Sequence, residues 1–143
     1  MASGEWLATS AGALVADANK PRHYKELIVW QKGMSLARSI YEITARFPAD
    51  ERLGLISQMR RAAVSVPSNI AEGQARQSTR EFLQFLSHAS GSVAELETQL
   101  LLSVEMKCCS RGDAEGAAGL IDEIQKMIAA LRRTLENSLA TRH

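Results

Sequence analysis

Five polar side chains form the first candidate for a site in this sequence. They are Gln58, Arg61, Asn69, Glu72 and Glu95. Two interpretations suit such a set: a hydrogen-bonded network that fixes how two helices align, or a site for an anion or small ligand. Charges are costly to bury unless they are paired, so a buried network has to be fully connected. We interpret the set as a structural polar network in which Arg61 pairs with Glu95, and ligand binding is the alternative.

Six basic side chains are candidates for contact with the phosphates of RNA or DNA. They are Lys25, Lys32, Arg38, Arg60, Arg76 and Arg80. A solvated helix surface is the competing interpretation for each, and no aromatic residues interleave with them to stack single-stranded bases. The net charge is only +1 over 143 residues. A nucleic-acid surface therefore needs local clustering, or repetition of the chain in an oligomer.

Side chains that carry metal or nucleophilic chemistry are sparse. A di-iron bundle needs Glu-x-x-His motifs, but the residue three before His88 is Phe85. Cys108 and Cys109 are adjacent, which is not the spacing of a zinc site and suits packing in a reducing cytoplasm. No histidine and acid are placed to activate a serine. We expect no catalytic residues, no metal and no cofactor, and therefore no enzyme.

The elements that must position these residues are helices, because no segment alternates apolar and polar residues with period two. Helices are predicted over 23–46, about 50–73, 78–109 and about 113–139, with a capping-box pattern at Ser78. Four helices joined by short loops predict an all-α, antiparallel, up-down-up-down four-helix bundle over 23–143. Residues 1–22 are predicted to be a disordered tail, since they make a poor signal peptide and contain no membrane-spanning run.

Apolar residues recur every three or four positions in each predicted helix, and these stripes are the expected core. The expected core positions are Leu27, Trp30, Met34, Ala37, Tyr41 and Thr44 in the first helix, Ile56, Met59, Ala63, Val66 and Ile70 in the second, Phe82, Leu86, Ala89, Val93, Leu96 and Leu100 in the third, and Ala117, Leu120, Ile124, Met127 or Ile128, Leu131 and Leu135 in the fourth.

Further apolar residues lie beside the stripe of the third helix. They are Leu83, Phe85, Leu101 and Leu102. One stripe is enough to fill an intramolecular core, so a second indicates burial against another subunit. We take these residues as a candidate oligomer interface, with a wider core face as the alternative.

Pro67 interrupts the pattern of the second helix. Proline removes one N–H and crowds the carbonyl of the residue four positions before it, so a helix that continues through Pro67 is expected to be kinked. Folding the second and third helices about residue 77 places Pro67 level with Ser87. The kink is therefore predicted to pack on the small residues at 87–92.

Three separated stretches carry a family resemblance. They read W-Q-K-G-M (30–34), S-Q-M-R-R-A-A-V-S-V-P-S-N-I-A-E-G (57–73) and F-L-x-x-A-x-G-S-x-x-E-L-E-T-Q-L (85–100). In this order they resemble the bacterial four helix bundle protein family, whose founding members are encoded in intervening sequences of large-subunit ribosomal RNA genes. The resemblance covers roughly residues 24–135. The family also includes the accessory variability protein of diversity-generating retroelements.

The resemblance implies a cytoplasmic bundle that assembles into a ring, commonly a pentamer, with no enzymatic activity. It implies RNA, DNA or a reverse transcriptase as partner, although this chain is nearly neutral whereas the retroelement relative is basic. Two functional hypotheses follow. One is a ring-like homo-oligomeric accessory protein that binds nucleic acid or a nucleic-acid enzyme, and the other is a protein–protein scaffold with no nucleic-acid role.

Overall fold

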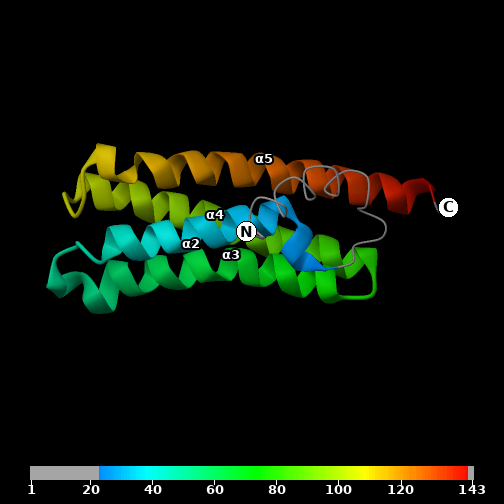
Figure 1. The fold of residues 1–143 in the computed structure, drawn as a ribbon, viewed down its shortest axis with the longest axis horizontal. Coiled ribbons are helices and arrows are strands. Elements are labelled where there is room, and N and C mark those ends of the chain that lie inside the picture. Colours follow the sequence, from blue (N-terminus) through cyan, green and yellow to red (C-terminus); the bar gives the residue numbers. More distant parts are fainter. Residues whose placement is uncertain (1–22, 142–143) are drawn as a thin grey trace.

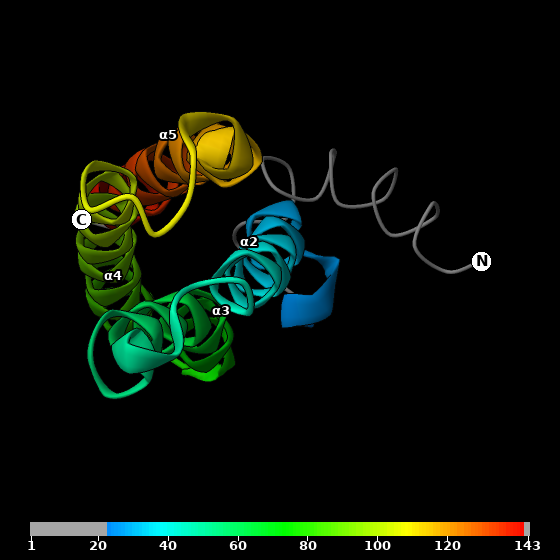
Figure 2. The same ribbon diagram turned by 90° about the vertical axis from the view of Figure 1, so that its left-hand side faces the viewer.

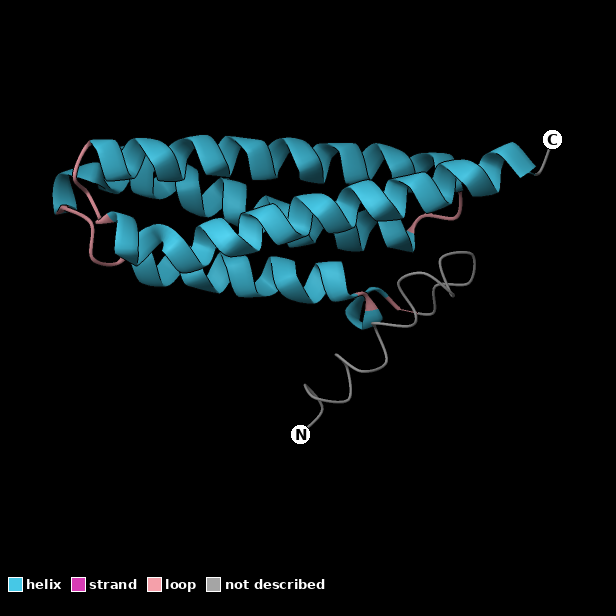
Figure 3. Ribbon diagram, turned by 90° about the horizontal axis from the view of Figure 1, so that it is seen from above, coloured by secondary structure: helices cyan, strands magenta, loops and turns pink. Residues whose placement is uncertain are grey.

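The computed structural model describes residues 23–141, except for the side chains of Arg52 and Leu53. The predicted tail, residues 1–22, lies outside the described residues. The elements of the described part are η1 (Tyr24–Glu26), α2 (Ile28–Thr44), η2 (Ala49–Glu51), the π-helical turn η3 (Arg52–Ile56), α3 (Ser57–Ala75), α4 (Thr79–Glu105) and α5 (Arg111–Thr141). Figure 3 shows helices and loops and no strand in this part of the chain.

The four long helices lie side by side and run in alternating directions (Figure 1). Viewed end-on, they are arranged in the order α2, α3, α4, α5 around a common core, and α5 returns to pack against α2 (Figure 2). The prediction of an antiparallel up-down-up-down bundle is therefore confirmed. None of the helices in the described part is both long and apolar enough to cross a membrane.

The core follows the predicted stripes in α3 and α4. All five expected positions of the second predicted helix are buried, Ile56 in η3 and the other four in α3. All six of α4 are buried too, and Ile124, Ile128, Leu131 and Leu135 of α5 join them. Leu120 and Met127 are only partly buried at its edge, and Ile121 is buried instead. An unbroken 3/4 spacing was enough to identify these faces, because in α3 and α4 one stripe is clearly more apolar than its neighbours.

The predicted stripe of α2 is wrong by one position around the helix. The buried residues are Val29, Gly33, Leu36, Ile40 and Ile43, together with Thr44. Most of the predicted residues lie at the edge of the core or outside it: Trp30 and Ala37 are partly buried, and Met34 and Tyr41 are exposed. Both stripes have helical spacing. The aliphatic one takes the core, whereas the stripe with the amphipathic Trp and Tyr rings remains at the rim.

Pro67 lies inside the continuous helix α3, as predicted, and a bend at this point stays a prediction. Its expected partner is wrong. Pro67 faces Gly33 of α2, where an added Cβ would lie 3.3 Å from the Pro67 Cβ, and not the small residues at 87–92. In that patch Gly91 is exposed, and an added Cβ would meet nothing within 4 Å. The proline ring therefore packs where α2 offers a residue with no side chain.

Side chains cap the starts of the last two helices. The Ser78 Oγ accepts a hydrogen bond from the Glu81 N–H at 3.0 Å, as its capping-box pattern predicts. At the start of α5 the exchange is reciprocal. The Asp113 N–H donates to the Ser110 Oγ at 3.0 Å, and the Ser110 N–H donates to the Asp113 Oδ2 at 3.2 Å. These bonds satisfy N–H groups that a helix start leaves without a partner.

Candidate interaction surfaces

A polar groove of about 440 Å³ lies between α3 and α4. Its lining residues are Gln58, Arg61, Ala62, Ser65, Ser92 and Glu95. The two helices meet here through small hydroxyl groups, because the Ser65 and Ser92 Oγ atoms lie 2.8 Å apart. Asn69 braces this contact by donating from its Nδ2 to both the carbonyl oxygen and the Oγ of Ser65, each at 2.8 Å.

This geometry corrects the prediction that the five polar residues form a buried network. Four of its five members are exposed, namely Gln58, Arg61, Glu72 and Glu95, and Asn69 is half-buried. Among the described residues no ion pair joins Arg61 to Glu95, whose Oε2 instead accepts a hydrogen bond from Gln99 at 3.5 Å. The long polar side chains lie outside the Ser65–Ser92 contact, where water can solvate their charges.

Three of the six candidate basic residues are held by contacts within the chain. Lys32 forms an ion pair with Glu123 of α5 at 3.2 Å. Arg76 pairs with Glu72 at 2.8 Å and its guanidinium lies 4.9 Å from the centre of the Phe85 ring. These contacts link neighbouring turns or helices. Part of the positive charge that was predicted to contact nucleic-acid phosphates is therefore already neutralised within the chain.

Arg60 is the most firmly anchored of these three. Its Nε donates to the Thr44 Oγ1 at 2.9 Å, an Nη donates to the Tyr41 carbonyl at 3.3 Å, and the guanidinium lies 4.4 Å from the Tyr41 ring centre. Arg60 therefore ties α3 to the end of α2. The other three candidates, Lys25, Arg38 and Arg80, are exposed but come from η1, α2 and α4.

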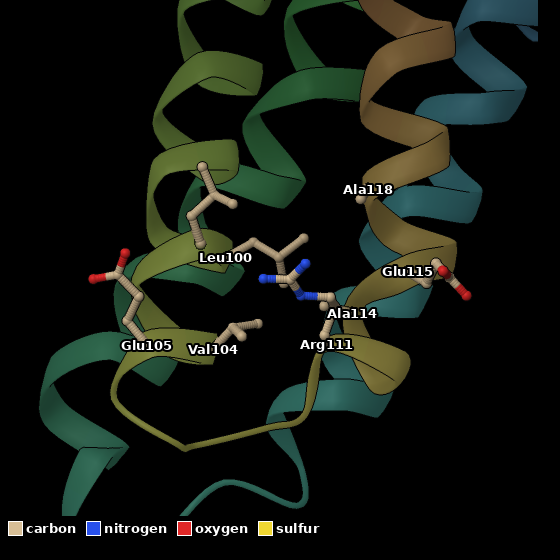
Figure 4. Close-up of a pocket in the computed structure, with 8 residues that line it drawn as sticks. Leu100, Val104, Glu105, Arg111, Ala114, Glu115 and Ala118 are labelled. Atoms are coloured by element: carbon tan, nitrogen blue, oxygen red, sulfur yellow. The ribbon is translucent and has the colours of Figure 1, made fainter.

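The four candidate interface residues divide into two pairs. Leu83 and Phe85 are half-buried, and Leu83 packs against the core. Leu101 and Leu102 are 63% and 45% exposed. Leu101 also lines an apolar groove of about 360 Å³ with Leu100 and Val104 of α4 and with Arg111, Ala114 and Ala118 of α5 (Figure 4). The two exposed members of this candidate interface thus lie at the C-terminal end of α4, and Met106, directly after this helix, is also 59% exposed.

A second apolar groove, also about 360 Å³, runs between α2 and α3 and was missed from the sequence. Its lining residues are Tyr24, Trp30, Met34, Ala37, Val64, Pro67, Ser68 and Ala71. Three of them, Trp30, Met34 and Ala37, belong to the stripe that the spacing of the first predicted helix assigned to the core. Recognising that residues 28–44 carry two apolar stripes, of which only one can face the core, would have revealed it.

The cysteines and acids do not form a metal-binding group in the described part of the chain. Within residues 23–141, no three His, Cys, Asp or Glu side chains gather closely enough to hold a metal ion. Cys108 and Cys109 are free thiols at the α4–α5 turn. Desolvation raises the pKa of the Cys108 thiol, and the nearby Glu51 carboxylate raises it further. The thiol therefore remains protonated at neutral pH, which is unlike a nucleophile.

Comparison with protein families identifies the chain. A family model described as 23S rRNA-intervening sequence protein matches residues 25–130. The chain belongs to this family. No curated protein matches the chain significantly. The family match covers α2, α3, α4 and much of α5, and it leaves residues 1–22 outside.

The stretches that carry the family resemblance meet in the folded chain. Gly33, from the first stretch, receives Pro67 from the second. Gly73, at the end of the second stretch, lies where an added Cβ would be 2.7 Å from the Phe85 Cβ, at the start of the third. In this member of the family, the two glycines therefore allow α3 to approach α2 and α4 closely.

Proposed function

We propose that the protein is a non-enzymatic accessory protein of the cytoplasm that forms a ring-like homo-oligomer and contacts RNA or DNA. Assembly into five subunits, and a reverse transcriptase as an alternative partner, are what the family resemblance implies. The observation that carries the proposal is the exposure of Leu101 and Leu102 beside a core that is already filled. Its cytoplasmic setting is supported by the free thiols of Cys108 and Cys109.

Assembly accounts for the exposed leucines. Leu101, Leu102 and Met106 are exposed apolar residues at the end of α4, here called the apolar ridge, and Leu101 also lines a groove between α4 and α5. Removing apolar surface of this kind from water stabilises the assembled state by about 25 cal/mol per Å². The contact would be hydrophobic, and its strength should therefore change little with salt.

Nucleic-acid contact is supported by the description of the family, which names 23S rRNA, and by the exposure of three of the six candidate basic residues, Lys25, Arg38 and Arg80. One chain with net charge +1 has little attraction for phosphate. A ring repeats Lys25, Arg38 and Arg80 in every subunit and sums their potential. Oligomerisation and nucleic-acid binding are therefore coupled in this proposal.

Light scattering on the purified protein tests the assembly. We expect an oligomer whose mass is insensitive to salt, and we expect Leu101→Glu to give smaller particles that keep the helical circular dichroism of the parent. Ala129→Glu adds the same charge at an exposed position of α5 and should leave the mass unchanged. Leu83 is unsuitable because it packs on the core. A monomeric parent at micromolar concentration would sink the proposal.

A protein–protein scaffold is the second candidate, and one observation favours it. Lys32, Arg60 and Arg76 are engaged within the chain, which leaves half of the expected phosphate contacts. An assembly that binds another protein needs the apolar ridge but not these cations. Binding of RNA that weakens steeply with salt would exclude the scaffold-only function.

A further inference from the structure

Six large apolar side chains are exposed among the residues that the structure describes, and they fall into two groups. The first group is the apolar ridge at the end of α4. The second is Met34 and Tyr41 of α2 with Val64 of α3, which are 45%, 44% and 43% exposed. Exposed apolar side chains that gather in this way mark surfaces of interaction.

The second group borders a groove. Met34 and Val64 belong to opposite walls of the apolar groove between α2 and α3, here called the α2/α3 groove. Pro67 also lines it and is buried against Gly33 of α2. Tyr41 is not a lining residue, but it lies two turns after Met34 and therefore on the same face of α2. The groove thus combines a buried floor with exposed apolar walls.

The two groups lie on different sides of the bundle. Around the core the helices follow the order α2, α3, α4, α5, so the α2/α3 groove lies between the first two and the ridge belongs to α4, across the core from α2 (Figure 2). A closed ring of identical subunits joins two different surfaces at each contact, whereas one surface that meets its own copy closes a dimer. The proposed ring therefore needs a second surface that receives the ridge.

Charged side chains of opposite sign accompany the two surfaces. Glu97 and Glu105 are exposed one turn before and one turn after the first leucine of the ridge. Arg61 is exposed one turn before the valine of the α2/α3 groove, and in the described part of the chain none of the three forms an ion pair. The bases near the ridge, Lys107 and Arg111, lie beyond it at the α4–α5 turn. Rim charges of this kind orient two partners more than they strengthen the contact.

We propose that the apolar ridge of one subunit docks into the α2/α3 groove of a second copy of the chain, and that this head-to-tail contact repeats around the ring. The inference rests on the proposed assembly and adds the surface that receives the ridge. Leucines of the ridge would pack between Met34 and Val64, which removes both groups of exposed apolar side chains from water. Arg61 of the receiving subunit would face the glutamates beside the ridge.

Mixing two assembly-deficient variants of the full chain tests the proposal. Leu101→Glu blocks the ridge and Met34→Glu blocks the groove, so each variant alone should be a monomer by light scattering. An equimolar mixture should form a particle of twice the monomer mass and no larger, because each pair retains one intact ridge and one intact groove. The matched control is Met34→Glu mixed with Val64→Glu. Both of these variants lack the groove, so this mixture should stay monomeric.

Two results would overturn this docking while leaving the proposed assembly intact. One is a parent oligomer whose mass survives both Met34→Glu and Val64→Glu, because the groove would then take no part in the contact. The other is a mixture of the ridge and groove variants that stays monomeric, because the two surfaces would then not meet each other. A monomeric parent would instead refute the assembly itself. All three substituted side chains are exposed, so circular dichroism should show the helix content of the parent in each variant.

Discussion

Gly73 illustrates how a single hydrogen can set the distance between two helices. A Cβ at this position would lie 2.7 Å from the Phe85 Cβ and 3.1 Å from the Phe82 Cδ1. The Phe85 Cβ is attached to the α4 backbone and cannot swing away, so the helices themselves have to separate. We expect Gly73→Ala to destabilise the protein by about 1–3 kcal/mol, as overpacking does. Urea unfolding followed by circular dichroism measures this.

Gly91→Ala is the control for this prediction. Gly91 is also inside a helix, but it is exposed and a Cβ there would meet nothing within 4 Å. Alanine is favoured over glycine in a helix by about 0.5–1 kcal/mol, so this variant should be slightly more stable than the parent. If both alanine variants were stabilised alike, the close approach at Gly73 would be refuted.

Asp113 should make stability depend on pH. The Ser110 backbone N–H donates to its carboxylate and lowers the pKa of Asp113, and the side-chain hydrogen bond with Ser110 acts in the same direction. A carboxyl whose pKa is lowered by folding stabilises the protein above its unfolded pKa of about 3.9, and this contribution is lost as the pH falls through the folded value.

Asp113→Asn is therefore expected to lower the urea midpoint at pH 7, and the difference from the parent should shrink as the pH falls below about 4. Asp122→Asn, in the middle of α5, controls for the loss of an exposed carboxylate whose partner is Lys126. A midpoint difference that stays constant from neutral to acidic pH would contradict the capping role of the charge.

At the scale of elements, α4 ends in a left-handed turn that contains no glycine. Lys107 has φ 64°. The Cys108 N–H donates to the Ser103 carbonyl at 2.9 Å and the Lys107 N–H donates to the Val104 carbonyl at 3.0 Å, which is the Schellman pattern. This geometry favours glycine at position 107, because a side chain is strained at positive φ.

Lys107→Gly should consequently stabilise the protein by up to about 1 kcal/mol, since relief of the strain exceeds the added flexibility of the unfolded chain. Thermal melting provides the measurement. Lys107→Ala, which removes the same charge and retains a Cβ, should not share the gain. Equal melting temperatures for the two variants would mean that loss of the lysine charge, and not loss of the Cβ, causes any gain in stability.

The helices show which patterns in the sequence determine structure. Spacing alone identified the buried faces of α3 and α4, because each has a single dominant apolar stripe. It chose the wrong stripe of α2, where two stripes compete and only the partner helices decide between them. The docking of Pro67 failed for a related reason. Counting equal numbers of residues in both directions from a loop predicts how far along the bundle a residue lies. It does not predict which neighbouring helix the residue faces.

The polar residues were harder to place than the apolar ones. Arg61 and Glu95 do line one groove, but an α3–α4 contact through Ser65 and Ser92 leaves both side chains in water. Whether a long charged side chain turns into a helix contact or out of it depends on the distance between the helices. That distance follows from small residues such as Gly73, so it is a property of the packed bundle.

At the scale of the whole molecule, the exposed charges determine what RNA binding would look like. Arg38 and Arg80 are exposed on α2 and α4, whereas Lys32 is paired with Glu123. Each phosphate neutralised by a cation contributes about 0.7–0.9 to the slope of log affinity against log salt concentration. The parent protein is therefore expected to bind an RNA oligonucleotide more weakly at about 200 mM salt than at about 50 mM.

Fluorescence anisotropy with labelled RNA tests this, on protein whose oligomeric mass has been verified for each variant. Arg38→Glu with Arg80→Glu should weaken binding at low salt and flatten the salt dependence, because two phosphate contacts per subunit are lost. Lys32→Gln should change both quantities less, since its charge is already engaged by Glu123. Binding that is absent, or indifferent to salt and to all three substitutions, would reject the nucleic-acid role and leave the protein–protein scaffold as the function of the assembly.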